Sequence, residues 1–582
     1  MTRFHFFLVI LALAAHGVGL RSTFVYDDHR FVVSNDALDT LTVEEAFLRP
    51  GTQTIDADRD VYRPLRALSH AFDVSRWGRE PFGFHLHSIL LHLLTVLLAF
   101  EVLTRLRLPG GHVPPLAGAM ALAIHPLGVE VVGWISSRGD QYALFFGLAA
   151  LGLAIPSPAN PRPTHWRSIA AGILVLLACL GKESALATPL IFAAHSRFLG
   201  LKNRKMLIAL IAGAILSLGL RQWALHGASP IQTTPHGGTI LTQVGWAFFG
   251  MGQAVQHFFL PVSLSIEYPQ AEWARGLSPW LKPSTLMCFA SIMALTYVMV
   301  RKKVPPWAFL LTWAFLAYLP TSSLLVTLRS LVADRYAFPT LLPLGALFGL
   351  IIAQRVPRYA TLAVLLLALF TIPLTVNRTT VFATDESLWL DALDTAPQSP
   401  RVHIGLANAT EDPASIGIHL RRAVDMAARG SKQEPYALLQ LGQHILRVEK
   451  NSRGAIPILE GAIGSLARHQ ASLNPFDQQI YLALLLAEAY RLEGRYQDAE
   501  PLIESALADA RSPQGIIARG TDPVLALLLA RIRNRIPLAV GLHNEQTWAN
   551  VESSWAEAED HAPGHPAVKM LRREIDLAKT ER

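Results

Sequence analysis

The stretch RFHFFLVILALAAHGVGLRSTFVYDDH, residues 3–29, holds the two features from which the rest of the chain can be interpreted. Its apolar part, 4–20, predicts a membrane span. Two adjacent carboxylates, Asp27 and Asp28, follow a few residues after that span. Such a pair is often only a solvated loop or a helix cap, but a membrane-embedded transferase needs its general base at this place. The polar residues near the outer ends of later spans favour the role of general base for this acidic pair.

The first apolar segment also fits a cleaved signal peptide, because Arg3 precedes an apolar run with small residues at Ala14-Ala15. We expect the segment to be retained as a span. The apolar stretch is long, and cleavage would remove the anchor beside the acidic pair.

Composition divides the chain into two regions. Of its 582 residues, 51% are hydrophobic and only 16% are charged, whereas soluble proteins carry about 25% charged residues. The shortfall lies before residue 377, so we expect a membrane domain, 1–376, and a soluble domain, 377–582. The net charge of +7 comes from Lys and Arg in short runs between apolar segments. That pattern is typical of topology signals and predicts no nucleic-acid partner.

The hydropathy pattern predicts about eleven spans, some of them shorter than usual. They are 4–20, 85–104, 114–131, 139–155, 168–181, 184–198, 206–222, 284–300, 306–325, 336–353 and 359–376. With this map the basic loops fall on one side, which the positive-inside rule makes cytoplasmic. The N-terminus is then cytoplasmic, and the C-terminal domain lies outside the cytoplasm.

Two external loops follow from the map, 21–84 and 223–283. Residues 243–260 within the second are apolar enough to cross the membrane. A span there would move the basic cluster at Arg301 to the outer side, so we expect a re-entrant or interfacial pair of helices instead.

Ionisable residues recur near the predicted outer ends of the spans, where they are costly and usually functional. They include His85 and His92 on one helix face, Glu130, Arg138, Lys182, Asp334 and Arg335. Each alone is more often a snorkelling or capping residue. Together they predict a polar cavity open to the outer side, in which Arg138, Lys182 and Arg335 bind an anionic head group such as a phosphate.

The chain lacks motifs for other chemistries. It has no Gly-rich phosphate loop, His-Glu-x-x-His or Cys-x-x-Cys, and no serine nucleophile elbow. The two cysteines, Cys179 and Cys288, lie in apolar segments and suggest neither a disulfide framework nor a metal site. Without a domain for a nucleotide sugar, a transferase would take its donor from the lipid. A phosphate that is bound by Lys and Arg side chains needs no metal ion. The sequence does not exclude that a divalent metal ion takes part.

The C-terminal region has helical periodicity and fits tetratricopeptide helix pairs. Residues 486–506 match well, 436–463 match with one insertion, and 400–429 look like a degenerate copy. Stacked pairs of this kind predict a surface for peptides or partner proteins, although a packed helical domain without a ligand fits as well.

These residues resemble the transmembrane and tetratricopeptide-repeat O-mannosyltransferases and, more broadly, the multi-span GT-C glycosyltransferases. The likeness rests on Tyr26-Asp27-Asp28, Tyr62-Arg63-Pro64-Leu65, Gly83-Phe84-His85-Leu86, Leu91-His92, His125-Pro126 with Glu130, Ser137-Arg138, Gly181-Lys182-Glu183, Asp334-Arg335-Tyr336 and Asp385-Glu386-Ser387-Leu388-Trp389, in that order. Ser88 departs from the pattern, since the family often has Asn near this position.

The resemblance implies an all-α membrane fold and inverting transfer of a hexose such as mannose. The donor would be a sugar linked to polyprenyl or dolichyl phosphate. The acceptor would be the hydroxyl of a protein Ser or Thr outside the cytoplasm. Asp27 or Asp28 would be the base, with Asp28 orienting if Asp27 reacts. Substrate-positioning residues would be Tyr62, Arg63, His85, His92, Glu130 and Asp334.

Two other functions stay open. The chain fits a non-catalytic membrane scaffold whose repeats recruit an envelope protein, or an enzyme that glycosylates a glycolipid or cell-wall polymer. The acidic pair alongside the cations favours catalysis, and the repeats favour a protein acceptor by analogy. The short loops favour a bacterial inner membrane over the endoplasmic reticulum.

Overall fold

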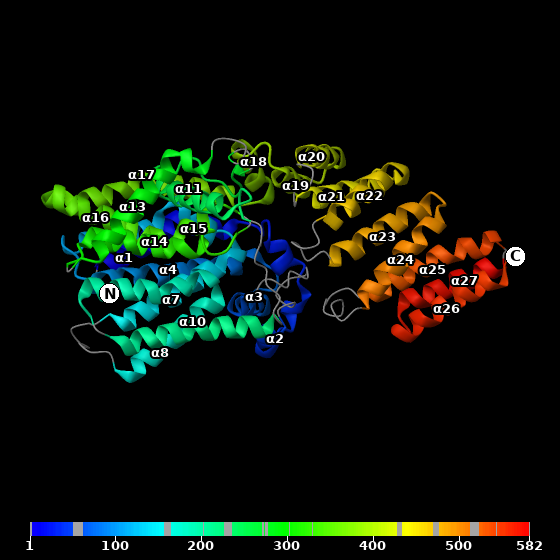
Figure 1. Cartoon of the computed structure of the whole chain (residues 1–582), viewed down its shortest axis with the longest axis horizontal. Helices are drawn as coiled ribbons and strands as arrows, with labels where there is room; N and C mark the ends of the chain where they lie inside the picture. The colour runs from blue at the N-terminus through cyan, green and yellow to red at the C-terminus, as the bar shows by residue number, and fades with distance from the viewer. Residues whose placement is uncertain are drawn as a thin grey trace. The chain divides into compact units, whose positions relative to one another are not determined.

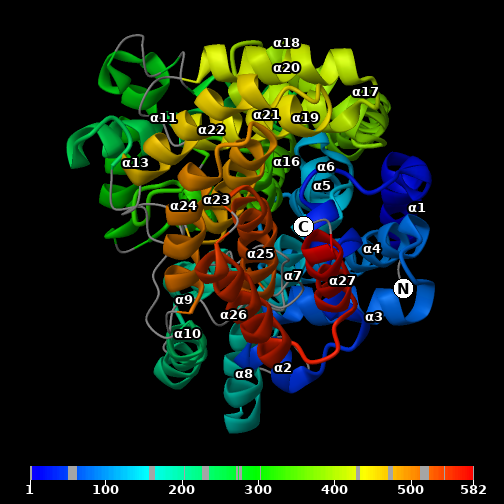
Figure 2. The same ribbon diagram turned by 90° about the vertical axis from the view of Figure 1, so that its right-hand side faces the viewer.

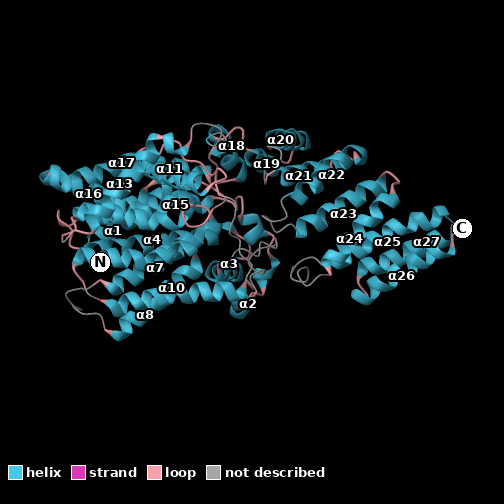
Figure 3. Ribbon diagram, viewed as in Figure 1, coloured by secondary structure: helices cyan, strands magenta, loops and turns pink. Residues whose placement is uncertain are grey.

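The computed structural model is built from helices throughout the part of the chain that it describes (Figure 3). It describes all residues except 1–2, 50–61, 156–163, 202, 226–234, 271–272, 274–277, 302, 329, 428–432, 469–475, 512–522, 543 and 581–582. The expected all-α fold is confirmed. Part of the first external loop, 50–61, lies outside the described residues.

The chain forms two compact units. The described helices of the first, which extends to Pro397, are α1 (Arg3–His16), α2 (Val43–Leu48), α3 (Pro64–Trp77), α4 (Pro81–Arg105), α5 (Val113–Ile124), α6 (Val129–Val132), α7 (Arg138–Ala154), α8 (His165–Gly181), α9 (Thr188–Leu199), α10 (Arg204–Ala224), α11 (Ile240–Phe259), α13 (Pro283–Met299), α14 (Pro306–Tyr318), α15 (Asp334–Ala337), α16 (Leu341–Arg355), α17 (Ala360–Val381) and α18 (Asp385–Thr395). The second unit begins at Gln398.

The first unit extends past residue 376, where the apolar sequence ends. The helix α18 is held to this unit by polar contacts, because Arg378 of α17 pairs with Asp391 at 2.6 Å. Asp385 also accepts a hydrogen bond from the backbone N–H of Tyr26 at 2.7 Å. A boundary drawn from hydropathy alone does not register such contacts.

Five described helical stretches are long and apolar enough to cross a membrane. They are Arg3–Arg21, Pro81–Arg105, Arg204–Ala224, Asp334–Arg355 and Pro357–Val381. A sixth is the pair Val113–Ile124 and Pro126–Val132, which bends by 53° at His125, and α8 and α13 are shorter apolar helices. The protein is therefore a polytopic membrane protein, and a total of eleven spans stays a prediction.

Small residues let the helices of this unit approach closely. A Cβ added to Gly213 of α10 would lie 2.1 Å from the carbonyl oxygen of Gly172 in α8, and these helices run side by side (Figure 1). A Cβ on Gly345 of α16 would lie 2.5 Å from Cβ of Ala121 in α5. Association through small residues is typical of membrane helices, where the hydrophobic effect does not drive packing.

Large apolar side chains remain exposed on the outer helices. In α17, Leu369 is 67% and Phe370 is 73% exposed, and in α10, Ile208 is 64% and Ile215 is 63% exposed. A water-soluble protein rarely exposes such continuous apolar surface. These faces are suited to contact with lipid tails.

Within the loop 223–283, the apolar residues 243–260 lie in one continuous helix, α11 (Ile240–Phe259). The expected re-entrant or interfacial pair of helices stays a prediction, because residues 226–234, 271–272 and 274–277 of this loop lie outside the described residues. No proline breaks the segment, and Thr239 caps its first turn through a reciprocal hydrogen-bond pair with Thr242. Where α11 lies relative to the membrane stays a prediction.

The second unit is a succession of antiparallel helix pairs (Figures 1 and 2). The described helices are α19 (Pro400–Ala409), α20 (Pro413–Met426), α21 (Glu434–Arg447), α22 (Ser452–Arg468), α23 (Phe476–Leu492), α24 (Tyr496–Ala510), α25 (Pro523–Leu542), α26 (Glu545–His561) and α27 (Pro566–Thr580). The two matched repeats form α21–α22 and α23–α24. Their pattern residues are core residues, including Leu459 and Ile503, and Gly494 makes the turn between α23 and α24 with φ of 73°.

Candidate active site

The two adjacent carboxylates lie in different environments. Asp28 is fully buried and accepts hydrogen bonds from Ser136 N at 2.7 Å, Ser136 Oγ at 2.5 Å and Val25 N at 3.2 Å. The side chain of Asp27 is 26% exposed and lies 3.8 Å from Arg30. Asp28 therefore ties the acidic loop to the segment before α7, while Asp27 is the carboxylate that a substrate can reach.

Burial raises the pKa of Asp28 to about 7, against the opposing effect of its hydrogen bonds. The charge of Asp27 also raises it but contributes least. Repulsion between the two carboxylates is thus a minor cause of the raised pKa, and desolvation is the main one.

This shift predicts a pH-dependent stability. An acid whose pKa is raised by folding stabilises the fold at low pH, and the contribution is lost as pH rises from about 4 through 7. Relative to Asp28→Asn, which cannot ionise, the wild type should lose about 2–3 kcal/mol between pH 5 and pH 8. Thermal unfolding of both proteins across this range measures the difference. Parallel curves would show that Asp28 titrates at its ordinary pKa.

The backbone of the acidic loop is held in an unusual conformation. Tyr26 has φ of 55°, a left-handed value that costs a bulky residue about 1–2 kcal/mol. Its ring packs against Trp134 and Trp389, each with centroids 5.3 Å away. Asp385 binds Tyr26 N at 2.7 Å and His29 Nε2 at 2.6 Å, which raises the pKa of His29. Residues distant in sequence thus fix where Asp27 lies.

A π-helical turn, His29–Val33, follows the acidic pair directly. Such turns are rare and often occur at functional sites. His85 Nε2 lies 3.3 Å from the carbonyl oxygen of Thr23, at the start of the same loop. The predicted positioning residue His85 therefore contacts the loop that carries the acidic pair.

The structure gives each cation predicted to bind phosphate a carboxylate partner. Arg138 pairs with Asp73 at 2.5 Å and Lys182 with Asp140 at 2.5 Å. Arg335 pairs with Glu130 through its guanidinium, and its backbone N–H donates to the same carboxylate at 2.8 Å. These roles in phosphate binding stay predictions, but none of the three cations has an unpaired charge.

Arg138 is fully buried with a full set of internal partners. Its guanidinium also donates to Ser88 Oγ at 3.2 Å, Ser69 Oγ at 3.3 Å and the carbonyl oxygen of Phe84 at 2.8 Å. Ser88, where the resembling family often has Asn, supplies one of these acceptors. This environment suits a residue that holds α3, α4 and α7 together.

Lys182 and Asp140 meet because two helices approach closely. A Cβ on Gly139 would lie 2.7 Å from the carbonyl oxygen of Gly181, so only glycine fits there. Next to them, Arg63 donates to Glu183 from Nε at 3.2 Å and Nη2 at 3.0 Å. Burial lowers the pKa of Lys182 to about 8, and Asp140 opposes this shift.

Trp134 connects the acidic loop with Arg335. The Arg335 guanidinium lies 5.4 Å from the centre of the Trp134 ring, whose other neighbour is the ring of Tyr26. The structure thus places Arg335 and its partner Glu130 near the loop of Asp27 through Trp134. Arg335 is partly accessible, with 17% of its side chain exposed.

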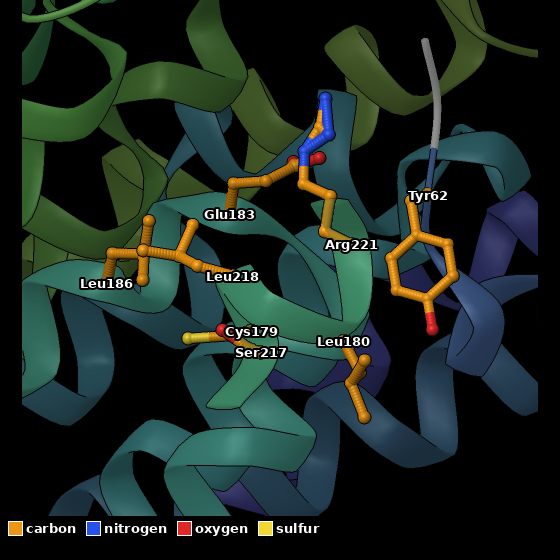
Figure 4. A pocket seen from close by; sticks show the side chains of 8 residues that line it. All are labelled: Tyr62, Cys179, Leu180, Glu183, Leu186, Ser217, Leu218 and Arg221. Atoms are coloured by element: carbon orange, nitrogen blue, oxygen red, sulfur yellow. The ribbon is translucent and has the colours of Figure 1, made fainter. Parts of the chain in front are cut away.

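The remaining predicted site residues are Tyr62, His92 and Asp334. Tyr62 lines a small hollow of about 10 Å³ with Glu183 and Arg221, whose polar ends point toward each other, while the Tyr62 hydroxyl points away from them (Figure 4). His92 packs against His16 at 5.0 Å. Asp334 accepts a hydrogen bond from Tyr268 at 2.5 Å and lies 3.6 Å from Arg378.

Sequence reasoning missed several residues of this region. Asp385 stood within a quoted motif, and Ser136 and Asp140 flank the quoted Ser137-Arg138, but none of the three was assigned a role. Arg66, Ser69 and Asp73 are all buried on one face of α3, and their helical spacing was a signal for a polar, inward-facing stripe. Among the described residues, no group of three or more His, Cys, Asp or Glu is placed to hold a metal ion.

Comparisons with known proteins confirm the predicted resemblance. A protein O-mannosyl-transferase of Drosophila melanogaster (Tmtc1) is 30% identical over 177 residues, 30% of this chain and 20% of the relative. A second from the same organism (Tmtc2) is 27% identical over 316 residues, 49% of this chain and 33% of the relative. A Caenorhabditis elegans protein O-mannosyl-transferase (F38B6.6) is 20% identical over 427 residues, 70% of this chain and 59% of the relative.

No protein-family model matches the chain. The matched segments span only a fifth to a third of the length of the two Drosophila relatives. The similarity to protein O-mannosyl-transferases extends over 30% to 70% of this chain in these three comparisons.

Proposed function

We propose that this protein is an inverting membrane glycosyltransferase. It moves a hexose such as mannose from a polyprenyl- or dolichyl-phosphate-linked donor to a hydroxyl, on protein Ser or Thr, outside the cytoplasm. The observation that carries the proposal is the pair of unlike carboxylates, in which the reachable Asp27 is set in place by the buried Asp28. The similarity to protein O-mannosyl-transferases supports the reaction class.

Asp27 is the base in this proposal. Its carboxylate accepts the proton of the acceptor hydroxyl while the hydroxyl oxygen forms a bond to the anomeric carbon of the sugar. The bond from that carbon to the phosphate oxygen breaks on the opposite face, so the configuration inverts and the electron pair leaves with the lipid phosphate. A positioned base contributes about 10²–10⁴-fold in rate.

Cations around the acidic loop stabilise the departing phosphate. Arg335 and Lys182 are partly accessible, at 17% and 12% of their side chains, and can turn one hydrogen-bond donor to the phosphate while keeping their carboxylates. Arg138 is fully enclosed, and we assign it to positioning.

An apolar hollow beside these residues supports a lipid-linked donor. It encloses about 50 Å³ and is lined by Leu144, Leu148 and Leu151 of α7, by α9 and α14, and by Asp140 at its polar part. Asp140 is the partner of Lys182. An apolar surface that meets a cationic group suits a donor whose phosphate is joined to a hydrocarbon chain.

The helical repeats would bind the protein acceptor, on the outer side of a bacterial inner membrane. Deletion of 398–582 should then abolish most glycosylation of envelope proteins while the first unit stays in the membrane at wild-type level. The measurement is mass spectrometry of envelope proteins and glycolipids from cells with the full or shortened chain. Loss of a glycolipid product with unchanged proteins would show that a lipid is the acceptor. Unchanged profiles for both classes would contradict a role for the repeats in acceptor binding.

A further inference from the structure

One buried cation near the acidic loop has no carboxylate of its own. Arg66 of α3 is 2% exposed, and its Nε and Nη2 have no hydrogen-bond partner among the residues that the structure describes. Its guanidinium lies 3.9 Å from the centre of the Phe31 ring. A ring compensates one face of a guanidinium but leaves its N–H edges unpaired.

The charges nearest to Arg66 belong to the acidic loop and to its partners. Arg63 and Arg30 repel it, and Asp27 and Glu183 attract it. Arg63 is bound to Glu183, and Asp27 lies beside Arg30. Three guanidinium groups thus lie close enough together for Arg63 and Arg30 to repel Arg66. Burial and the two like charges lower the pKa of Arg66 to about 9, so it stays protonated at neutral pH.

The ring of Phe31 also contacts a second guanidinium group. Arg30 lies 4.6 Å from the centre of the same ring, so two like charges share one aromatic side chain. A buried charge with unpaired donors is unfavourable, and a neutral residue would be more stable at this place. Unpaired donors on a buried guanidinium are suited to a ligand that brings a negative charge to them.

We infer that Arg66, with Arg63 and Arg30 beside it, binds the phosphate of the lipid-linked donor and of its lipid phosphate product. The inference rests on the proposed function and adds Arg66 to the cations that hold its leaving phosphate. The planar guanidinium fork matches two phosphate oxygens, and a phosphodiester offers a negative charge and acceptor oxygens to the unpaired N–H groups of Arg66. The anion enters past Arg30, whose side chain is 25% exposed.

The test is a binding measurement on the purified full chain in detergent. The probes are a polyprenyl phosphate, the matching uncharged polyprenol, and inorganic phosphate. The variants are Arg66→Gln, Arg66→Lys and, as matched control, Arg76→Gln on the exposed face of the same helix. Dissociation constants and the melting temperature without ligand are measured for each.

Arg66→Gln should weaken binding of polyprenyl phosphate at least tenfold, with no loss of melting temperature in the ligand-free protein. Arg66→Lys should recover part of the affinity, and Arg76→Gln should match the wild type. Polyprenol should bind weakly and without dependence on Arg66. The unchanged or higher melting temperature is the feature that a merely structural arginine would not produce.

Binding of polyprenyl phosphate within twofold of wild type in Arg66→Gln would overturn this inference and leave the proposed function standing. A lowered melting temperature with binding lost in proportion would also overturn it. Tight binding of inorganic phosphate that needs Arg66, with none of the lipid, would support the anion site but overturn its lipid assignment. No binding of polyprenyl phosphate by the wild type would overturn both this inference and the proposed donor.

Discussion

Asp27→Asn is expected to lower the rate of sugar transfer by about 10²–10⁴-fold while the protein stays folded. The amide keeps the size of the carboxylate but cannot accept the hydroxyl proton. Asp27 is partly exposed and lies near Arg30 at 3.8 Å, so the fold should not depend on its charge. The measurement is incorporation of labelled mannose from polyprenyl phosphate mannose into protein, in membranes that contain equal amounts of each variant.

Two further substitutions make this result specific. Asp36→Asn changes a carboxylate of the same loop that is 95% exposed and should leave transfer unchanged. Asp28→Asn should cause a smaller loss than Asp27→Asn, because the amide oxygen can still accept hydrogen bonds from Ser136. A wild-type rate in Asp27→Asn with complete loss in Asp28→Asn would identify Asp28 as the base.

Arg138→Met should destabilise the protein by about 3–5 kcal/mol, since it leaves the carboxylate of Asp73 buried without its cation. Both side chains are fully buried at 2.5 Å from each other, so water cannot replace the lost partner. Thermal unfolding in detergent measures the loss. Arg76→Met, on the exposed face of α3, is the control and should leave the melting temperature unchanged.

The double variant Asp73→Leu/Arg138→Met should recover most of that stability, because it removes both buried charges. Failure to recover would show that the other contacts of Arg138, with Ser69, Ser88 and Phe84, carry its effect. A wild-type melting temperature in Arg138→Met with lost binding of polyprenyl phosphate would instead support the phosphate-binding role predicted from the sequence.

The fold follows from the sequence because apolar runs and helical periodicity are local signals. The predicted spans fall mostly on helical residues, and the two matched repeats form helix pairs. Composition does not reveal whether an apolar stretch such as 243–260 is one helix or two. The first unit ends later than the boundary at residue 376 that hydropathy suggests, because the pair of Arg378 and Asp391 holds α18 to it.

The sequence alone pointed to the acidic pair of the candidate site and to the order of the motifs around it. Which ions pair was not, since each partner is distant in the chain: Arg138 with Asp73, Lys182 with Asp140, and Arg335 with Glu130. Adjacent carboxylates look alike in a sequence. Only the contacts with Ser136 and Arg30 distinguish a buried Asp28 from a reachable Asp27.

The most direct test of the central claim compares cells that carry the wild type with cells that carry Asp27→Asn. Mass spectrometry of intact envelope proteins and glycolipids is the measurement, with equal amounts of the two proteins confirmed in the membrane. If Asp27 is the base of a glycosyltransferase, the mass of one hexose is present on Ser- or Thr-containing proteins in the wild type and absent in the variant. Identical profiles from cells that express the wild type would contradict a glycosyltransferase and favour a non-catalytic membrane scaffold.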